Sequence, residues 1–115
     1  MPDAVSPTLT FEIERNGESA VVKCHGRMVA WSTDDFHQAV KSLLPETKTI
    51  VIDLKELTFV DSMGLGTLVR LYVSARQSGS KLTVEHLGKQ VRNVLSITNL
   101  LSVLAQAESH NINIA

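Results

Sequence analysis

The stretch Phe59–Gly66, which reads Phe-Val-Asp-Ser-Met-Gly-Leu-Gly, joins an apolar strand to a helix with apolar residues at helical spacing. The strand, Ile50–Leu54, precedes it, and the helix, Leu65–Arg76, follows it. Ser62 is therefore expected at a helix start, where backbone N–H groups lack intrahelical partners and carry partial positive charge. A serine oxygen, or a phosphate attached to it, would be stabilised at this position.

The residues before this stretch predict a hairpin and a first helix. Leu9–Arg15 and Ser19–His25 each alternate apolar and polar residues, and Asn16-Gly17 between them supplies the two positive-φ residues of a tight turn. Ser32–Asp35 has the Ser-x-x-Asp form of a helix N-terminal cap. The apolar residues of Phe36–Leu44 then recur at helical spacing.

The residues after it predict a strand, a helix and a last strand. Lys81–Leu87 reads as a short strand, Lys89–Ile97 as a helix that ends near Asn99, and Leu100–Leu104 as the last strand. The element order is β-β-α-β-α-β-α-β, which predicts an α/β fold. We expect an N-terminal β-hairpin followed by strand-helix units, forming a mixed sheet with helices packed mainly on one side.

The apolar pattern also predicts which side chains form the core. Cys24 is expected inside, as a small core residue, and Trp31 as a partly buried packing residue beside the start of the first helix. Thr67 is expected to face solvent. The inward face of the central helix is predicted to consist of Leu65, Leu68, Val69, Tyr72, Val73 and Arg76.

Length and composition indicate a single globular domain. The chain has 115 residues, 43% of them hydrophobic, and a net charge of −1. We expect residues 1–7 to be a disordered tail, 8–105 the domain, and 106–115 a C-terminal tail or short edge segment. The absence of a basic patch argues against nucleic acid as a partner. With no signal peptide and no 18-residue apolar run, we expect a cytoplasmic protein without membrane insertion.

An exposed serine at a strand-to-helix turn also raises the possibility of catalysis. A hydrolase nucleophile elbow requires Gly-x-Ser-x-Gly, but Val60 occupies the first glycine position, and none of the four histidines lies in a motif. Gly64-Leu65-Gly66 is not a dinucleotide fingerprint, because Val69 replaces the third glycine. Metal-ligand spacing is absent as well. The sequence therefore predicts no catalytic residue, no cofactor and no metal.

The two glycines after Ser62 allow two explanations. Gly64 and Gly66 each weaken a helix by roughly 0.5–1 kcal/mol relative to alanine. One explanation is turn geometry with close packing of the helix on the sheet. The other is that a surface without side chains lets the backbone of another protein approach Ser62. The residues alone favour neither.

The central motif resembles the signature of a known family. Val60–Gly66 is preceded by Ile-Val-Ile-Asp-Leu and followed by Leu-x-x-Leu-Tyr-x-x-Ala-Arg-x-x-Gly, a combination similar to that of the anti-sigma-factor antagonists of the STAS-domain family. The resemblance extends over nearly the whole chain and includes the Asn-Gly hairpin and Gly26 before the first helix. It implies a STAS fold and a role in protein–protein interaction, with no enzymatic activity.

The resemblance also implies a phosphorylation cycle at Ser62. In that family the unphosphorylated antagonist binds an anti-sigma factor of the serine-kinase type and releases the sigma factor. Phosphorylation ends this binding, and a phosphatase of the PP2C type restores it. The residues implied in partner binding are Asp61, Ser62, Met63, Gly64, Arg27 and Val29.

Two departures from the family pattern keep an alternative open. Met63 stands where many members have a second small hydroxyl residue, and Val29 stands where an acidic residue is common. The alternative is a STAS domain that serves as a constitutive interaction or ligand-sensing subunit, with Ser62 never phosphorylated. A small serine hydrolase remains a third hypothesis. The sequence does not identify the sigma factor, the signal or the oligomeric state.

Overall fold

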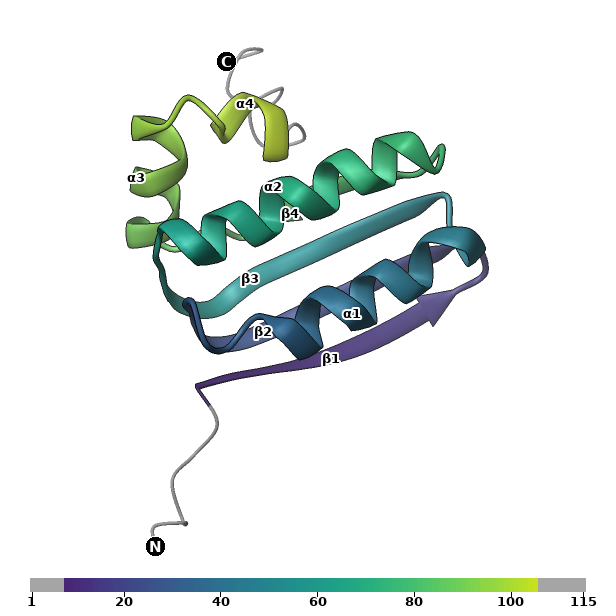
Figure 1. Cartoon of the computed structure of the whole chain (residues 1–115), viewed down its shortest axis with the longest axis horizontal. Helices are drawn as coiled ribbons and strands as arrows, with labels where there is room; N and C mark the ends of the chain where they lie inside the picture. Colours follow the sequence, from purple (N-terminus) through teal and green to yellow (C-terminus); the bar gives the residue numbers. More distant parts are fainter. Residues whose placement is uncertain (1–7, 106–115) are drawn as a thin grey trace, which may run out of the picture.

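The computed structural model describes residues 8–105, and the expectations for residues 1–7 and 106–115 lie outside this range. Strands alternate with helices along most of the chain (Figure 1). The elements are β1 (Leu9–Asn16), β2 (Ser19–Met28), α1 (Asp34–Leu43), a 3₁₀ turn η1 (Leu44–Glu46), β3 (Thr49–Val60), α2 (Ser62–Gln77), β4 (Lys81–Glu85), α3 (Lys89–Ile97) and α4 (Leu101–Leu104).

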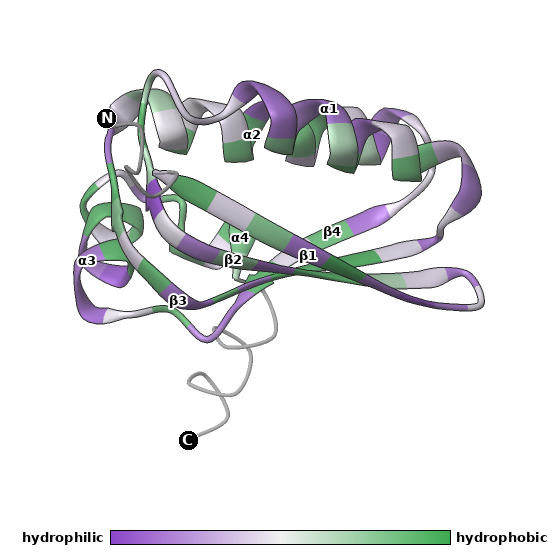
Figure 2. Cartoon of the chain, turned by 90° about the horizontal axis from the view of Figure 1, so that it is seen from below, coloured by the Kyte–Doolittle hydropathy of each residue, from purple (hydrophilic) through white to green (hydrophobic). Residues whose placement is uncertain are grey.

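The strands form one mixed sheet in the order β1-β2-β3-β4. β1 and β2 are antiparallel, whereas β2 with β3 and β3 with β4 are parallel. The two crossovers carry α1 and α2 to the same face of the sheet, as connections of one hand require. Figure 2 shows both helices in one layer over the strands, with their hydrophobic sides toward the sheet. α3 packs on β3, and α4 packs on β4. The mixed sheet and its strand-helix units confirm the predicted α/β fold class.

The core lies between the sheet and the α1–α2 layer. Alternate residues of β2 and β3 point into it, and the Phe11 and Phe36 rings meet edge to face with centroids 5.7 Å apart. Cys24 is buried, as predicted. Burial, with a smaller contribution from the charge of Asp53, raises the pKa of its thiol to about 12, so this cysteine is unreactive at neutral pH.

The inward face of α2 differs from the prediction. Val73 is 45% exposed and Arg76 is exposed, whereas Thr67 is buried. The Thr67 hydroxyl donates to the Met63 carbonyl at 3.2 Å, which removes the cost of burying it. The residues that face the sheet are Gly64, Leu65, Thr67, Leu68, Leu71 and Ala75. Three of these, Gly64, Thr67 and Ala75, are smaller than the aliphatic residues expected on this face.

The hairpin turn and the C-terminal end of β2 differ from the prediction, whereas β2 begins at Ser19 as predicted. The hairpin turn is centred on Gly17 and Glu18, one residue later than expected, and only Gly17 of the turn has a positive φ, +64°. At the other end β2 continues through Gly26 to Met28 across two register shifts. Gly26 has a φ of +105°, and a Cβ there would lie 2.2 Å from the Thr8 carbonyl oxygen, so only glycine fits.

The prediction of a last strand over residues 100–104 is wrong. The segment forms the short helix α4, after Asn99 reverses the chain with a φ of +62°, the left-handed cap expected of it. Leu101 and Leu104 are three residues apart, so both lie on the same side of a helix, and Leu104 enters the core. A short apolar run does not by itself distinguish strand from helix.

Asp53, on the sheet face opposite α1 and α2, makes stability depend on pH. Partial burial acts to raise the pKa of its carboxyl, but the Lys55 N–H and His86 Nδ1, each at 3.0 Å, together hold the pKa below its ordinary value. A lowered pKa stabilises the fold above the pKa of the unfolded chain, about 4, and this stabilisation is lost as pH falls through the folded pKa.

We therefore expect Asp53→Asn to lower the free energy of unfolding at pH 7 and to approach the wild type below about pH 3. Urea unfolding at both pH values measures the difference. Glu56→Gln, an exposed position near Asp53, is the charge-matched control. A difference between Asp53→Asn and wild type that stays constant with pH would contradict the assignment.

Candidate functional site

Ser62 is the first residue of α2 and is exposed. Its hydroxyl makes no hydrogen bond with any residue between 8 and 105. The N-terminal cap is Asp61 instead, whose Oδ1 accepts from the Gly64 N–H at 2.8 Å. The helix start is thus satisfied without Ser62, which leaves its hydroxyl free for chemistry from outside.

Asp61 also connects α2 to the loop between β2 and α1. Its Oδ2 accepts from the Ala30 N–H at 3.3 Å, and its own N–H donates to the Met28 carbonyl at 3.2 Å. One carboxylate therefore bridges the helix start and the loop of residues 29–33. This bridge places both segments in one rigid unit around Ser62.

The loop of residues 29–33 is ordered by Ser32, which does not act as the predicted helix cap. Its Oγ accepts from the Val29 N–H and lies 3.0 Å from the Arg27 carbonyl oxygen, to which it can donate. α1 begins two residues later, at Asp34, with Thr33 as a cap that makes no side-chain hydrogen bond. The prediction of a capping box at Ser32–Asp35 is therefore wrong.

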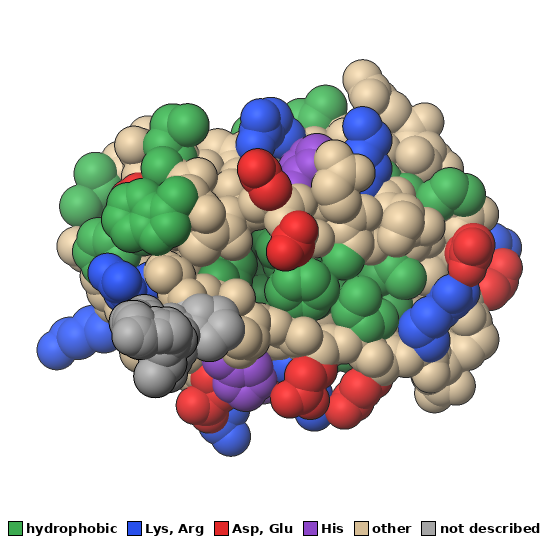
Figure 3. Space-filling view, turned by 60° about the horizontal axis from the view of Figure 1, so that its bottom comes forward, with side chains coloured by type: hydrophobic (Ala, Val, Ile, Leu, Met, Phe, Trp, Pro, Cys, Tyr) green, Lys and Arg blue, Asp and Glu red, His purple; other side chains and the backbone are tan. Residues whose placement is uncertain are grey.

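Trp31 projects from this loop and is 73% exposed, so the prediction that it is a partly buried packing residue is also wrong. Phe59 and Met63 are 39% and 61% exposed. Each of the three lies within two residues of Ala30 or Asp61, which are hydrogen-bonded to each other. We call Ser62, Trp31, Phe59 and Met63 the Ser62 surface. Figure 3 shows apolar side chains gathered at this end of the molecule, on its left.

The remaining predicted site residues surround or underlie the Ser62 surface. Arg27 is exposed and pairs in register with Phe59 across β2 and β3. Val29 is buried under the loop, and Leu65 is in the core, as expected. Gly64 is buried as well. Arg27 is therefore placed for direct contact with another molecule, and Val29 and Gly64 support the surface from below.

The two glycines of α2 have different environments. A Cβ at Gly64 would lie 2.0 Å from the Met28 carbonyl oxygen, so close packing explains this glycine. A Cβ at Gly66 would meet nothing within 4 Å. Packing therefore leaves Gly66 unexplained, and the hypothesis of a surface kept free of side chains applies to Gly66 alone.

Gln90, at the start of α3, holds the chain just before Asp61. Its Oε1 accepts from the Val60 N–H at 3.0 Å, and its Nε2 donates to the Val60 carbonyl at 3.2 Å. The side-chain amide thus replaces a neighbouring strand at the end of β3. Nothing in the sequence signals this role, because a single glutamine on the polar side of a helix is ordinary.

The described residues hold no second group that would make Ser62 a nucleophile. Two described histidines pair with carboxylates, His86 with Asp53 and His25 with Glu12, and no histidine between residues 8 and 105 is hydrogen-bonded to Ser62. Residues 8–105 contain no group of three His, Cys, Asp or Glu side chains that could hold a metal ion. His110 lies outside this range. The serine hydrolase hypothesis therefore has no support in the geometry.

No helix within residues 8–105 has both the length and the apolar character needed to cross a membrane.

Comparison with known proteins identifies the family. A family model described as "Mlab, STAS domain" matches residues 11–113. A STAS-domain containing protein of Pseudomonas aeruginosa is 26% identical over 84 residues, which cover 73% of this chain and 83% of that protein. The anti-sigma-B factor antagonist of Bacillus subtilis is 22% identical over 96 residues, covering 84% of this chain and 88% of the relative.

Solved structures share the fold. An anti-sigma factor antagonist from Mycobacterium paratuberculosis superimposes with a TM-score of 0.73 at 22% identity, covering 87% of this chain and 86% of that one. The murine Solute Carrier 26 family member A9 anion transporter superimposes with a TM-score of 0.68 at 20% identity, over 84% of this chain but only 16% of the transporter. With the fold, the Asp-Ser turn and the family model in agreement, the chain belongs to the STAS-domain family.

Proposed function

We propose that this protein is an anti-sigma-factor antagonist controlled by phosphorylation of Ser62. In the unphosphorylated form it binds an anti-sigma factor of the serine-kinase type in the cytoplasm, which releases the sigma factor. Phosphorylation of Ser62 by that kinase ends the binding, and a phosphatase of the PP2C type restores it. The protein itself acts as a binding module and catalyses no reaction.

The observation that carries this proposal is an exposed serine hydroxyl, without a hydrogen bond to any residue between 8 and 105, on a helix start and a hydrogen-bonded loop that together expose three large apolar side chains. A monomeric protein gains nothing from exposing Trp31, Phe59 and Met63 around one serine, whereas a partner protein would bury them. The hydroxyl is also accessible to a kinase. Partner binding and modification therefore use the same surface.

A phosphate on Ser62 would affect the protein and its complex in opposite ways. At the first residue of α2 the helix dipole and the free N–H groups favour negative charge, so the fold should tolerate the modification. In a contact with a partner, the same group would add about −1.5 to −2 charges between apolar side chains. Removing such a charge from water without a counter-charge is costly enough to separate the partners.

The other predicted site residues have supporting roles in this proposal. Asp61 holds the helix start and the loop of residues 29–33 in the geometry that the partner recognises. Arg27 contributes a cation at the edge of the Ser62 surface, and Met63 contributes apolar contact area. Val29 and Gly64 act from the interior, because both are buried.

Phosphorylation can be tested directly by intact mass. Incubation with the partner kinase and ATP is expected to add one phosphate, 80 Da, to the wild type and none to Ser62→Ala, because Ser62 is the acceptor. Ser96, exposed at the end of another helix, provides the control variant Ser96→Ala, which should be labelled like the wild type. An unlabelled wild type, or equal labelling of Ser62→Ala, would refute the phosphorylation switch.

A second candidate is a constitutive STAS subunit of a larger complex, which the fold match to one part of an anion transporter favours. In that case the Ser62 surface would still bind a partner, but without modification. The same mass experiment separates the two candidates. An unlabelled protein whose complex is lost when Met63 is changed to a charged residue would favour the constitutive subunit.

A further inference from the structure

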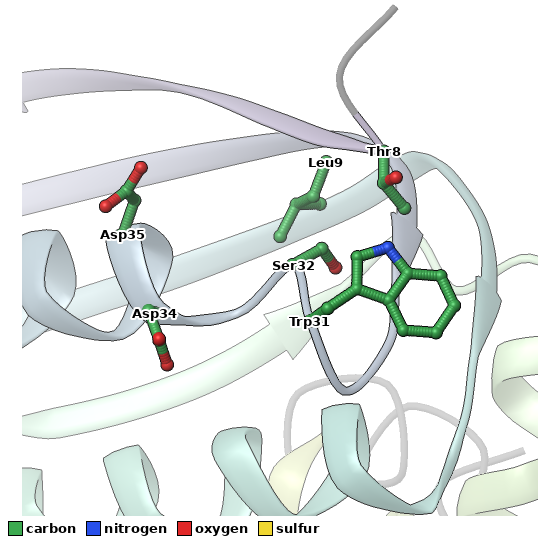
Figure 4. A pocket seen from close by; sticks show the side chains of 6 residues that line it. All are labelled: Thr8, Leu9, Trp31, Ser32, Asp34 and Asp35. Atoms are coloured by element: carbon green, nitrogen blue, oxygen red, sulfur yellow. The ribbon is translucent and has the colours of Figure 1, made fainter.

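A groove at the edge of the Ser62 surface contains two acidic side chains, Asp34 and Asp35, that have no role in the proposed function. It has a volume of about 320 Å³ and is lined by Thr8, Leu9, Trp31, Ser32, Asp34 and Asp35. In the view of Figure 4, Leu9 lies between Trp31 and Asp35, while Asp34 points away from Asp35. The groove thus has the indole of Trp31 at one end, the carboxylate of Asp35 at the other, and the aliphatic side chain of Leu9 between them.

The acidic side chains in this groove form no ion pair with any residue between 8 and 105. Among residues 8–105, five acidic side chains form ion pairs, in Arg15–Glu46, Lys23–Glu14, His25–Glu12, Lys48–Glu18 and His86–Asp53. Asp34 and Asp35 form none in the same range, and both are exposed. Their place in the first turn of α1 stabilises that helix, but it does not explain the exposed indole beside them.

The loop backbone that carries the indole is held in position by hydrogen bonds. Ser32, next to Trp31, is hydrogen-bonded to the backbone of Arg27 and Val29, and Ala30 is bonded to Asp61. A large apolar side chain on an ordered loop requires less ordering of the backbone when a partner binds. An indole face also attracts cations more strongly than any other aromatic side chain.

From these observations we propose that the groove receives an arginine side chain of the partner protein. The planar guanidinium stacks on the Trp31 indole, the aliphatic stem packs on Leu9, and the Asp35 carboxylate at the other end of the groove attracts the guanidinium through space. Asp34 adds attraction at longer range. The inference rests on the proposed function, because the loop that carries Trp31 is tied to Asp61, so a partner covering Ser62 reaches the groove.

The arginine site can be tested without the partner. Trp31 is the only tryptophan in the chain, so the single indole Nε1–H signal in a ¹⁵N spectrum of the full-length protein reports on the groove. We expect acetyl-arginine amide to shift this signal saturably. Acetyl-citrulline amide, which is nearly isosteric but neutral, should shift it little. Equal shifts with the two compounds would overturn the proposal.

Variants show which of the two carboxylates contributes more to arginine binding. Asp35→Asn is expected to weaken arginine binding at least threefold, and Asp34→Asn less than that. Glu56→Gln, a neutralised acid elsewhere on the surface, should bind as the wild type does. Unchanged binding in Asp35→Asn, with its fold verified by urea unfolding, would also overturn the proposal.

The test keeps the two proposals separate. Ser62→Ala should give the same arginine titration as the wild type, because the groove does not include Ser62 and the substitution adds no charge. A saturable arginine shift in a protein that no kinase phosphorylates would uphold the groove and refute the switch. The reverse outcome, phosphorylation with no arginine-specific shift, would uphold the switch and refute the groove.

Discussion

Replacing Ser62 by aspartate is expected to lower affinity for the anti-sigma factor at least 100-fold, equivalent to about 2.7 kcal/mol. The carboxylate would lie among Trp31, Phe59 and Met63, which a bound partner encloses. A charge enclosed without a counter-charge costs several kcal/mol. Calorimetric titration of the antagonist with the anti-sigma factor measures the change.

Ser62→Ala is the matched control for this effect. It removes the hydroxyl but adds no charge, and no internal hydrogen bond is lost within residues 8–105. Its affinity should stay within a few-fold of the wild type. Because Asp61 rather than Ser62 caps α2, both variants should unfold at nearly the wild-type urea concentration. Equal affinities of Ser62→Asp and Ser62→Ala would contradict the mechanism.

Replacing Gly64 by alanine is expected to lower the free energy of unfolding by about 2 kcal/mol or more. The new methyl group would lie 2.0 Å from the Met28 carbonyl oxygen and 2.9 Å from a Val60 methyl carbon. The first of these atoms is backbone and also accepts the Asp61 N–H, so it cannot move without weakening that bond. Urea unfolding followed by circular dichroism measures the loss.

For Gly66→Ala, two residues further along the same helix, we expect the opposite effect on the free energy of unfolding. Its Cβ would meet nothing within 4 Å, so alanine should stabilise the protein by up to about 1 kcal/mol through its higher helix propensity. Destabilisation by both substitutions to a similar extent would show that helix geometry, rather than the Met28 carbonyl, controls this region. Weaker partner binding by a more stable Gly66→Ala would support the hypothesis of a bare contact surface at Gly66.

Much of the fold could be predicted from the sequence because its signals are local. The bounds of α3 agree with the prediction, and Gly79 after α2 has the positive φ of a helix C-cap, +80°. Ile50–Leu54 is apolar on both alternation phases except at Asp53, a pattern typical of a central parallel strand, which β3 is. Ser62 at the helix start followed from the same local pattern.

The errors concern features that depend on particular hydrogen bonds. Trp31 is apolar, and composition alone places such a residue inside, but the bonds from Ser32 and Asp61 hold its loop so that the indole points outward. Thr67 is polar, and the Met63 carbonyl satisfies it inside. In each case the deciding partner belongs to a hydrogen-bond arrangement that hydrophobic periodicity does not encode.

The amide of Gln90 has a consequence for solubility. β4 pairs with β3 only from Thr49 to Asp53, so the rest of β3 has no neighbouring strand on that side within residues 8–105. An unpaired strand edge is a template on which other chains can add and aggregate. α3 covers this edge, and Gln90 occupies both backbone groups of Val60. The residue that holds the chain just before Asp61 is thereby expected also to protect the protein from assembling into β-sheet aggregates at high concentration.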